Sequence, residues 1–203
     1  MNKPTNYENT PAGSDFIPVE LGAHYAKIMN VSERETKNGD PMIVVSIDFD
    51  KKDPQAGYFM NQYKSDTRPD KKYPNQATNY ITTEYNGACT RGFKSFIKAF
   101  ADSNGLDMEK DIKWGSDFIG QFKNKKIGVV FGNVEELYNG EIKMRRKIRW
   151  FCDYAKVSDQ RIPDDSLLKE NKSEGNASAP TTVPAAVDPL SIPDTSDELI
   201  PFE

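Results

Sequence analysis

The sequence is poor in the residues on which metal binding and redox chemistry depend. Its 203 residues include two cysteines and one histidine. Cys89 and Cys152 match no zinc or redox spacing, and we interpret them as reduced thiols of a cytosolic protein. His24 has no catalytic motif around it, so we interpret it as an ordinary surface or strand histidine. We therefore expect no catalytic residue, no metal site and no cofactor.

Long apolar stretches are also missing. The longest runs are a few residues, such as "MIVV" at 42–45 and "VVF" at 129–131, so we expect no membrane-spanning segment. The first sixteen residues contain no apolar core of the kind found in secretory signals. Neither a Walker-type phosphate loop nor a Gly-rich dinucleotide fingerprint is present. These absences favour a cytoplasmic protein that is not an enzyme.

Negative charge is concentrated at one end of the chain. The formal net charge is −4. From residue 171 onward Lys172 is the only base among six acids, which gives that tail −5 and leaves +1 for residues 1–170. A nearly neutral body can carry a basic groove even though the whole protein is acidic.

Composition divides the chain into four parts. Residues 1–18 are polar with several prolines, and we interpret them as a flexible N-terminal arm. Residues 19–163 carry the strand and helix patterns of one domain. Residues 164–193 have the composition of a flexible linker, and residues 194–203 form an acidic and apolar tip.

The patterns within the domain are mostly those of strands. We expect strands in 22–34, 42–50, 57–66 and 79–85, and a long hairpin of 125–138 with 141–154 around the Asn139-Gly140 turn. A helix is predicted over 89–103, where Phe93, Phe96, Ile97, Phe100 and Ala101 recur at helical spacing. We therefore expect a mainly β fold, an OB-like five-stranded barrel with a helix inserted between strands 3 and 4.

The second strand of the hairpin alternates cations with apolar residues. We expect Ile142, Met144, Ile148 and Trp150 on one side, together with Arg146, and a stripe of four cations on the other: Lys143, Arg145, Lys147 and Arg149. At two residues apart, successive cations stand about 6.5–7 Å from each other, which suits the phosphates of an extended single strand. The alternative is a solvated strand face paired with Glu135, Glu136 and Glu141.

Tyrosines are frequent in the expected strands. Their number exceeds what a core needs, since each buried hydroxyl requires a partner. Flat rings among bases and small polar residues are typical of surfaces that stack nucleic-acid bases. The preferred stacking residues are Tyr58, Tyr63, Tyr80 and Tyr85, and a further tyrosine, Tyr138, lies at the hairpin tip.

The last ten residues, "DTSDELIPFE", place acids before an Ile-Pro-Phe cluster. They resemble the acidic tip of bacterial-type single-stranded DNA-binding proteins, which docks into basic, apolar pockets on replication, recombination and repair proteins. The resemblance implies that partners contact Asp194, Asp197, Glu198, Ile200, Pro201 and Phe202. In that family the chain stops at the phenylalanine, whereas here Glu203 follows it.

The body resembles a group of bacteriophage proteins that replace the bacterial ones. The resemblance covers roughly residues 21–158, through "GAHYAKIMNVSERETKNGDPMIVVSIDFD", "FKSFIKAFADSNG" and "FIGQFKNKKIGVVFGNVEELYNGEIKMRRKIRW". It implies an OB barrel that binds single-stranded DNA during phage replication and recombination, in the cytoplasm of the host. The implied protein partners are a polymerase, helicase, nuclease or recombinase.

Three hypotheses follow from these observations. The first is a protein that binds single-stranded DNA without strong sequence preference and recruits partners through its tip. The second is an interaction adaptor of the replication machinery without DNA binding of its own. The third is a Mg²⁺-dependent nuclease using Asp48 and Asp50, which share a strand face but belong to no recognisable nuclease motif.

Overall fold

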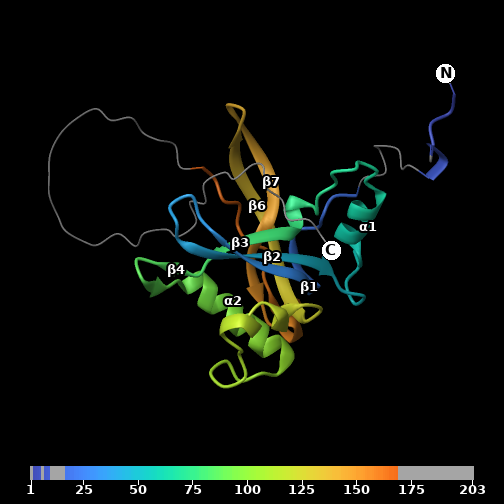
Figure 1. Cartoon of the computed structure of the whole chain (residues 1–203). Coiled ribbons are helices and arrows are strands. Elements are labelled where there is room, and N and C mark those ends of the chain that lie inside the picture. Colours follow the sequence, from blue (N-terminus) through green and yellow to red (C-terminus); the bar gives the residue numbers. More distant parts are fainter. Residues whose placement is uncertain (1, 6, 10–16, 169–203) are drawn as a thin grey trace, which may run out of the picture.

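The computed structural model describes residues 2–5, 7–9 and 17–168 (Figure 1). In chain order the strands and helices are β1 (Gly22–Glu35), β2 (Pro41–Phe49), α1 (Tyr58–Ser65), β3 (Thr78–Thr82), β4 (Glu84–Tyr85), β5 (Ala88–Cys89), α2 (Arg91–Asn104), β6 (Lys126–Tyr138) and β7 (Glu141–Cys152). Short 3₁₀ turns include η3 (Asn75–Ala77) and η6 (Tyr154–Asp159). Within the described part of the chain, no helix is both long enough and apolar enough to cross a membrane.

Five strands form one antiparallel sheet in the order β3-β2-β1-β6-β7, and β4 and β5 form a separate ribbon. The prediction of a mainly β fold is therefore confirmed, as is a helix between the third and fourth strands of the sheet. The sheet is open between its two edge strands, β3 and β7, rather than closed into a barrel. One side-chain contact links this open side, where Gln76 Nε2 donates to the carbonyl of Arg146 at 3.0 Å.

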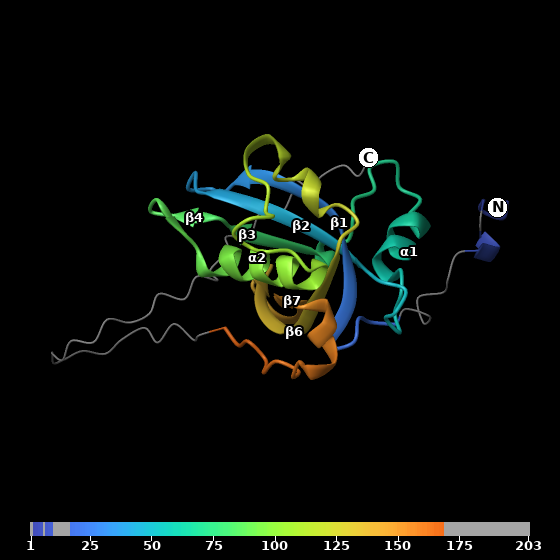
Figure 2. The same cartoon turned by 90° about the horizontal axis from the view of Figure 1, so that it is seen from below.

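Helix α2 forms as its spacing predicts. The Thr90 hydroxyl accepts from the Phe93 amide at 3.2 Å and caps the first turn, and Gly105 ends the helix with a φ of 65°. The five apolar positions of the predicted stripe are all buried. Figure 2 shows α2 lying along the curved sheet, so that its apolar face fills the space the sheet surrounds.

Helix α1 (Tyr58–Ser65) occupies nearly all of 57–66, so the prediction of a strand there is wrong. Asp48, at the end of β2, accepts hydrogen bonds from the amides of Phe59 at 3.1 Å and Met60 at 3.4 Å. This carboxylate therefore provides an acceptor for two backbone amides in the first turn of α1, which have no partner within the helix. The Phe59 side chain is fully buried in the core. Because the capping residue lies in another element, the local sequence did not reveal it.

The hairpin of β6 and β7 turns at Asn139 and Gly140, whose φ angles of 52° and 81° are those a type I′ turn requires. The predicted hairpin is thus confirmed. Its alternation is broken, however, because Phe131 pairs with Ile148 and Val130 with Trp150, which leaves Arg149 as the extra residue of a β-bulge. Consequently Trp150 packs in a separate small cluster and not beside Ile148 as predicted.

Candidate nucleic-acid interface

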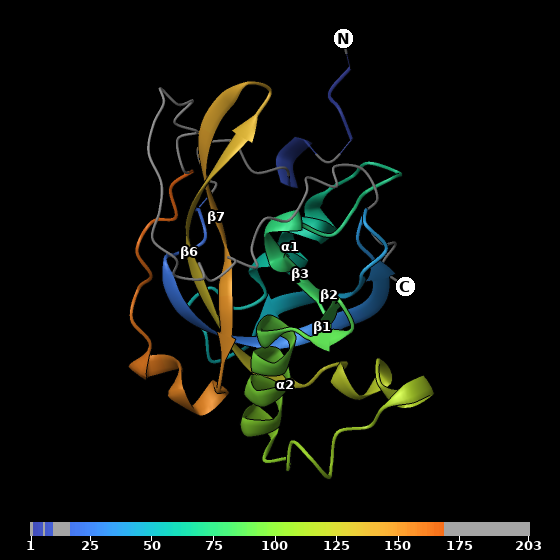
Figure 3. The same ribbon diagram turned by 90° about the vertical axis from the view of Figure 1, so that its left-hand side faces the viewer.

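The β6–β7 hairpin extends beyond the sheet as a two-stranded arm. Pairing between β1 and β6 ends at Gly22 and Phe131, whereas β6 and β7 continue to pair up to Tyr138 and Glu141. We define residues 132–147 as the arm, and Figure 3 shows it projecting away from the rest of the domain. Residues 126–152 contain six bases and three acids, so this hairpin is the basic part of a nearly neutral body.

The free end of the arm combines an aromatic ring with two cations. Tyr138 is 48% exposed. The Nζ atom of Lys143 lies 5.2 Å from the centroid of its ring, and the Cζ atom of Arg145 lies 5.5 Å away. A ring that stacks with bases next to cations that contact phosphates is the arrangement by which single strands are bound. Tyr138 was not among the preferred stacking residues. The sequence could have indicated this ring, because Tyr138 precedes the Asn-Gly turn and therefore lies diagonal to Lys143 in the hairpin.

Two of the four predicted cations have acidic partners on the arm itself. Lys143 Nζ lies 3.1 Å from Glu141 Oε2, and Lys147 forms an ion pair with Glu136. These pairs match the alternative interpretation of a self-neutralised face. An exposed ion pair contributes about 0–1 kcal/mol, so a phosphate can replace the glutamate at small cost. Arg145 forms no ion pair within the described part of the chain.

Arg149 has a structural role. Its Nη1 donates to the carbonyl of Asn133 at 3.1 Å and to that of Asp164 at 3.3 Å. Arg149 is the bulge residue, outside the regular alternation of β7, and its guanidinium holds the chain after η6 against β6. Further along, Ser166 forms a parallel bridge with Val134. The predicted stripe therefore comprises three cations on the arm and one at its base.

Two of the predicted stacking tyrosines lie on α1. Tyr58 is half-buried against the core, and its burial raises the pKa of its phenol. The guanidinium of Arg146, which donates to the carbonyl of Val19, lies close enough to Tyr58 to oppose part of that rise. The ring of Tyr63 lies 5.8 Å from that of Tyr73, with Lys71 Nζ 4.7 Å from its centroid. Both rings therefore already have close neighbours within the domain.

The other two predicted stacking residues lie on different strands. Tyr80 is half-buried on β3 opposite Val44, and burial raises its pKa. Tyr85, on the β4–β5 ribbon, is 58% exposed. The four tyrosines thus lie on three elements, α1, β3 and the β4–β5 ribbon, whereas the ring that Lys143 and Arg145 flank is that of Tyr138.

The opposite face of the arm is apolar at its free end, while Glu135, Asn133 and Arg146 follow on the same face toward the body. Leu137 and Ile142 lie directly opposite each other, and Met144 follows two residues along β7. These side chains are 63%, 62% and 46% exposed, respectively. An exposed apolar patch at the end of an arm suits contact with nucleobases or with another protein.

Asp48 and Asp50 are engaged separately. Asp48 caps α1, and burial raises the pKa of its carboxyl. Asp50 accepts the hydroxyl of Tyr154 at 2.9 Å. The described residues contain no group of three or more histidines, cysteines and acids that could hold a metal ion. The expected partner-binding residues of the tip, 194–203, lie outside the described part of the chain.

Comparison with known proteins gives no family. A scan against protein-family models finds no match, and a search of curated proteins finds none either. A functional conclusion therefore depends on the residues and their geometry.

Proposed function

We propose that this protein binds single-stranded DNA through the arm formed by β6 and β7. The observation that carries the proposal is the free end of the arm, where Lys143 and Arg145 flank the exposed ring of Tyr138. Stacking of a base on such a ring is worth about 1–3 kcal/mol, and the neighbouring cations add phosphate contacts. Contacts of both kinds are insensitive to sequence, so we expect little base preference.

The order of elements supports an OB-type fold as part of this proposal. OB domains are partly open five-stranded barrels that bind oligonucleotides on the face of strands 2–3 and on two loops, one of which joins strands 4 and 5. In this protein the arm is the connection between the fourth and fifth strands of the sheet. The open side between β3 and β7 agrees with a partly open barrel.

The resemblance to bacteriophage single-stranded DNA-binding proteins extends the proposal. In that role the protein coats DNA during phage replication and recombination. The tip then recruits a polymerase, helicase, nuclease or recombinase through Asp194, Asp197, Glu198, Ile200, Pro201 and Phe202. The support for this part is the sequence of the tip and its position after a linker-like segment.

The direct test is a titration of the full chain into fluorescently labelled oligo-dT and into a duplex of the same length, followed by anisotropy at low salt. We expect saturable binding to oligo-dT and weaker binding to the duplex. Absence of binding to oligo-dT, or equal affinity for the duplex, would reject the proposal.

A protein-interaction adaptor is the second candidate. It is favoured by the exposed apolar face of Leu137, Ile142 and Met144. Two substitutions separate the candidates: Arg145→Glu on the cationic face and Ile142→Asp on the apolar face. If the adaptor hypothesis holds, wild type does not bind oligo-dT and only Ile142→Asp reduces capture of replication proteins. Arg149 is unsuitable for this test because it holds the chain after η6 in place.

A further inference from the structure

A second group of lysines and tyrosines lies at the other end of β6. The rings of Tyr25 and Tyr154 meet edge to face at 5.0 Å. Lys52 Nζ lies 3.9 Å from the centroid of Tyr25 and 5.9 Å from that of Tyr154, while Lys126 Nζ lies 5.3 Å from the Tyr154 centroid. Residues from β1, β6, η6 and the turn after β2 thus converge on one surface. We call these four residues, with Lys27, the lysine–tyrosine cluster.

The lysines of the lysine–tyrosine cluster have acids nearby but form no ion pair with them in the described residues. Lys27 lies directly opposite Lys126 in the β1–β6 register, an arrangement of like charges that destabilises a sheet. In the part of the chain that the structure describes, Lys27, Lys52 and Lys126 form no ion pair. Lys52 and Lys126 are exposed. An anion bound between these side chains would relieve the repulsion.

The acids around the cluster accept hydrogen bonds from backbone amides and from Tyr154. Asp48 lies opposite Lys27 on β2, but its carboxylate accepts the amides of α1. Asp50 accepts the Tyr154 hydroxyl at 2.9 Å and the backbone amide of Lys52 at 3.2 Å. Asp153 accepts the amide of Ala155 at the start of η6. These carboxylates hold the backbone and Tyr154 in place. Burial raises the pKa of the Asp48 carboxyl, and nearby Lys27 opposes that rise without forming an ion pair.

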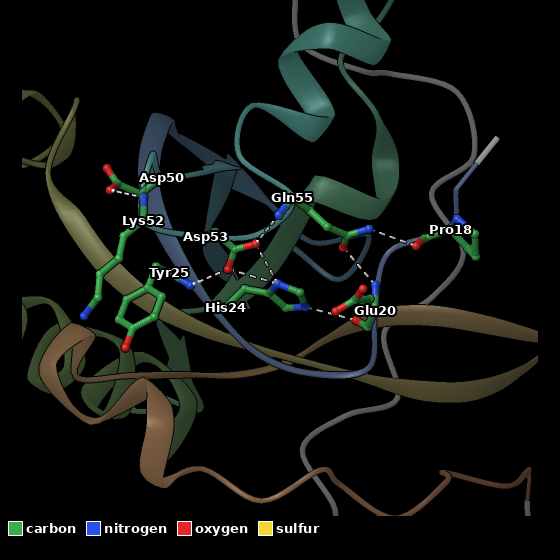
Figure 4. Close-up of polar contacts among 8 residues, drawn as sticks. All are labelled: Pro18, Glu20, His24, Tyr25, Asp50, Lys52, Asp53 and Gln55. Atoms are coloured by element: carbon green, nitrogen blue, oxygen red, sulfur yellow. Dashed lines mark hydrogen bonds and ion pairs between the residues drawn. The ribbon is translucent and has the colours of Figure 1, made fainter. Parts of the chain in front are cut away.

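A buried network fixes the two segments that carry Tyr25 and Lys52 (Figure 4). Asp53, 5% exposed, accepts the amide of Tyr25 at 2.9 Å through one oxygen and that of Gln55 at 2.9 Å through the other. His24 Nδ1 lies 3.1 Å from Asp53 Oδ2, and its Nε2 lies 3.0 Å from the carbonyl of Glu20. Strand β1 and the turn after β2 are therefore tied together, so the cluster is preorganised.

We propose that the lysine–tyrosine cluster is a second contact site for the phosphates of the single-stranded DNA that the arm binds. This inference rests on the proposed function. The tyrosine faces are covered by lysines, so the rings position ammonium groups and do not stack with bases. Eight residues of β6 separate Lys126 from Val134, which lies opposite Arg145, or about 26 Å at roughly 3.3 Å per residue. A long oligonucleotide reaches both sites, whereas a very short one reaches the arm alone.

The test compares two oligo-dT lengths, about 4 and about 15 nucleotides, near the limits of site size for one OB fold. The variant is Lys52→Gln with Lys126→Gln. Each phosphate contact contributes roughly 0.7 to the slope of log K against log salt for a single strand. For the long strand we therefore expect the loss of two contacts to reduce the magnitude of this slope by about 1.4. At about 0.1 M salt this corresponds to an affinity loss of about 25-fold. Affinity for the short strand should stay the same.

A matched control removes two lysines from another surface. Lys94→Gln with Lys113→Gln makes the same change in net charge, and both side chains are exposed. This control should leave the slope unchanged. Acetylation of surface lysines gives an independent readout, in which the long strand protects Lys52 and Lys126 but not Lys94, and the short strand protects none of them.

The outcomes separate this inference from the proposed function. If wild type binds neither strand, the proposed function fails and the inference fails with it. If wild type binds both strands but the Lys52/Lys126 variant keeps the wild-type slope, and neither lysine is protected, the lysine–tyrosine cluster is not a contact site. In that case DNA binding by the arm still stands.

Discussion

The two ends of β6 carry cations that face different neighbours. On the arm, Lys143 and Lys147 each lie beside a glutamate. At the other end, Lys52 and Lys126 lie near tyrosine rings, and in the described residues they form no ion pair. The arm is more conspicuous in sequence because its cations alternate along one strand. The comparison teaches that the number of cations on a surface matters less than what already neutralises them.

The two ends also differ in how they are held. The lysine–tyrosine cluster is built on the buried His24–Asp53 pair, whereas the arm is the part of β6 and β7 that extends beyond the pairing with β1. Its contacts with the body include those of Gln76 and of the chain after η6. A preorganised site loses little conformational freedom on binding, while an exposed arm can adapt to its ligand. The predictions below test this difference, in order of decreasing effect.

The largest effect is expected from Asp53→Ala. It leaves the amides of Tyr25 and Gln55 and the ring of His24 without their common acceptor in the interior. Each buried donor left without its acceptor typically costs about 1–3 kcal/mol of unfolding free energy. Urea denaturation of wild type and of Asp53→Ala measures this loss of unfolding free energy. Asp50→Ala, in the same turn but half-exposed, should cost about 1 kcal/mol or less, and an equal cost for both would contradict the role of the buried pair.

Charge reversal at the free end of the arm comes next. Lys143→Glu with Arg145→Glu removes two phosphate contacts and adds repulsion, so we expect oligo-dT affinity to fall on the order of 100-fold at about 0.1 M salt. Unfolding free energy should change little because both side chains lie outside the core. Anisotropy titration provides the measurement, and Lys94→Glu with Lys113→Glu is the control. An affinity within a few-fold of wild type would show that DNA does not contact this face.

Tyr138→Ala should weaken oligo-dT binding by about 1–3 kcal/mol, the worth of one stacked base. Tyr138→Phe keeps the ring and should bind nearly as wild type. Tyr85→Ala is the matched comparison, because that tyrosine is similarly exposed but lies on the separate β4–β5 ribbon. If Tyr85→Ala proves the more damaging change, the binding surface lies on the ribbon and not on the arm.

The smallest effect concerns Tyr154. Burial and the hydrogen bond to Asp50 raise the pKa of its phenol to about 12. The folded state therefore holds this proton more tightly than the unfolded chain, whose tyrosine pKa is about 10. Its contribution to stability is complete below about pH 10 and is lost as the pH rises toward 12. Wild type should lose stability relative to Tyr154→Phe over that interval in thermal unfolding, and a constant difference would contradict the assigned contact.

The elements that the sequence predicted are those with local signals. The helical spacing of Phe93, Phe96 and Phe100 is sufficient to place α2, and the Asn139-Gly140 turn places the hairpin. Both signals lie within a few residues of the structure they specify. Strand β2 was likewise visible from its apolar residues, although the structure buries every residue from Met42 to Phe49 and not only one side of the strand.

Features that depend on contacts distant in sequence were missed. Helix α1 begins where Asp48 accepts its amides, and the guanidinium of the bulge residue Arg149 binds the Asp164 carbonyl, fifteen residues further along the chain. The lysine–tyrosine cluster is assembled from four separate segments, so no window of sequence contains it. For the same reason the four predicted stacking tyrosines, chosen one by one, lie on three different elements.

The central claim is that single-stranded DNA binds the arm, and the salt dependence of oligo-dT affinity tests it most directly. If Lys143, Arg145 and Lys147 each contact one phosphate, each contributes roughly 0.7 to the salt dependence. Wild type should then show a slope of log K against log salt of about −2 or steeper. Substitution of Lys143→Gln with Arg145→Gln should reduce its magnitude by about 1.4. A flat salt dependence, or a slope that these substitutions leave unchanged, would contradict the account.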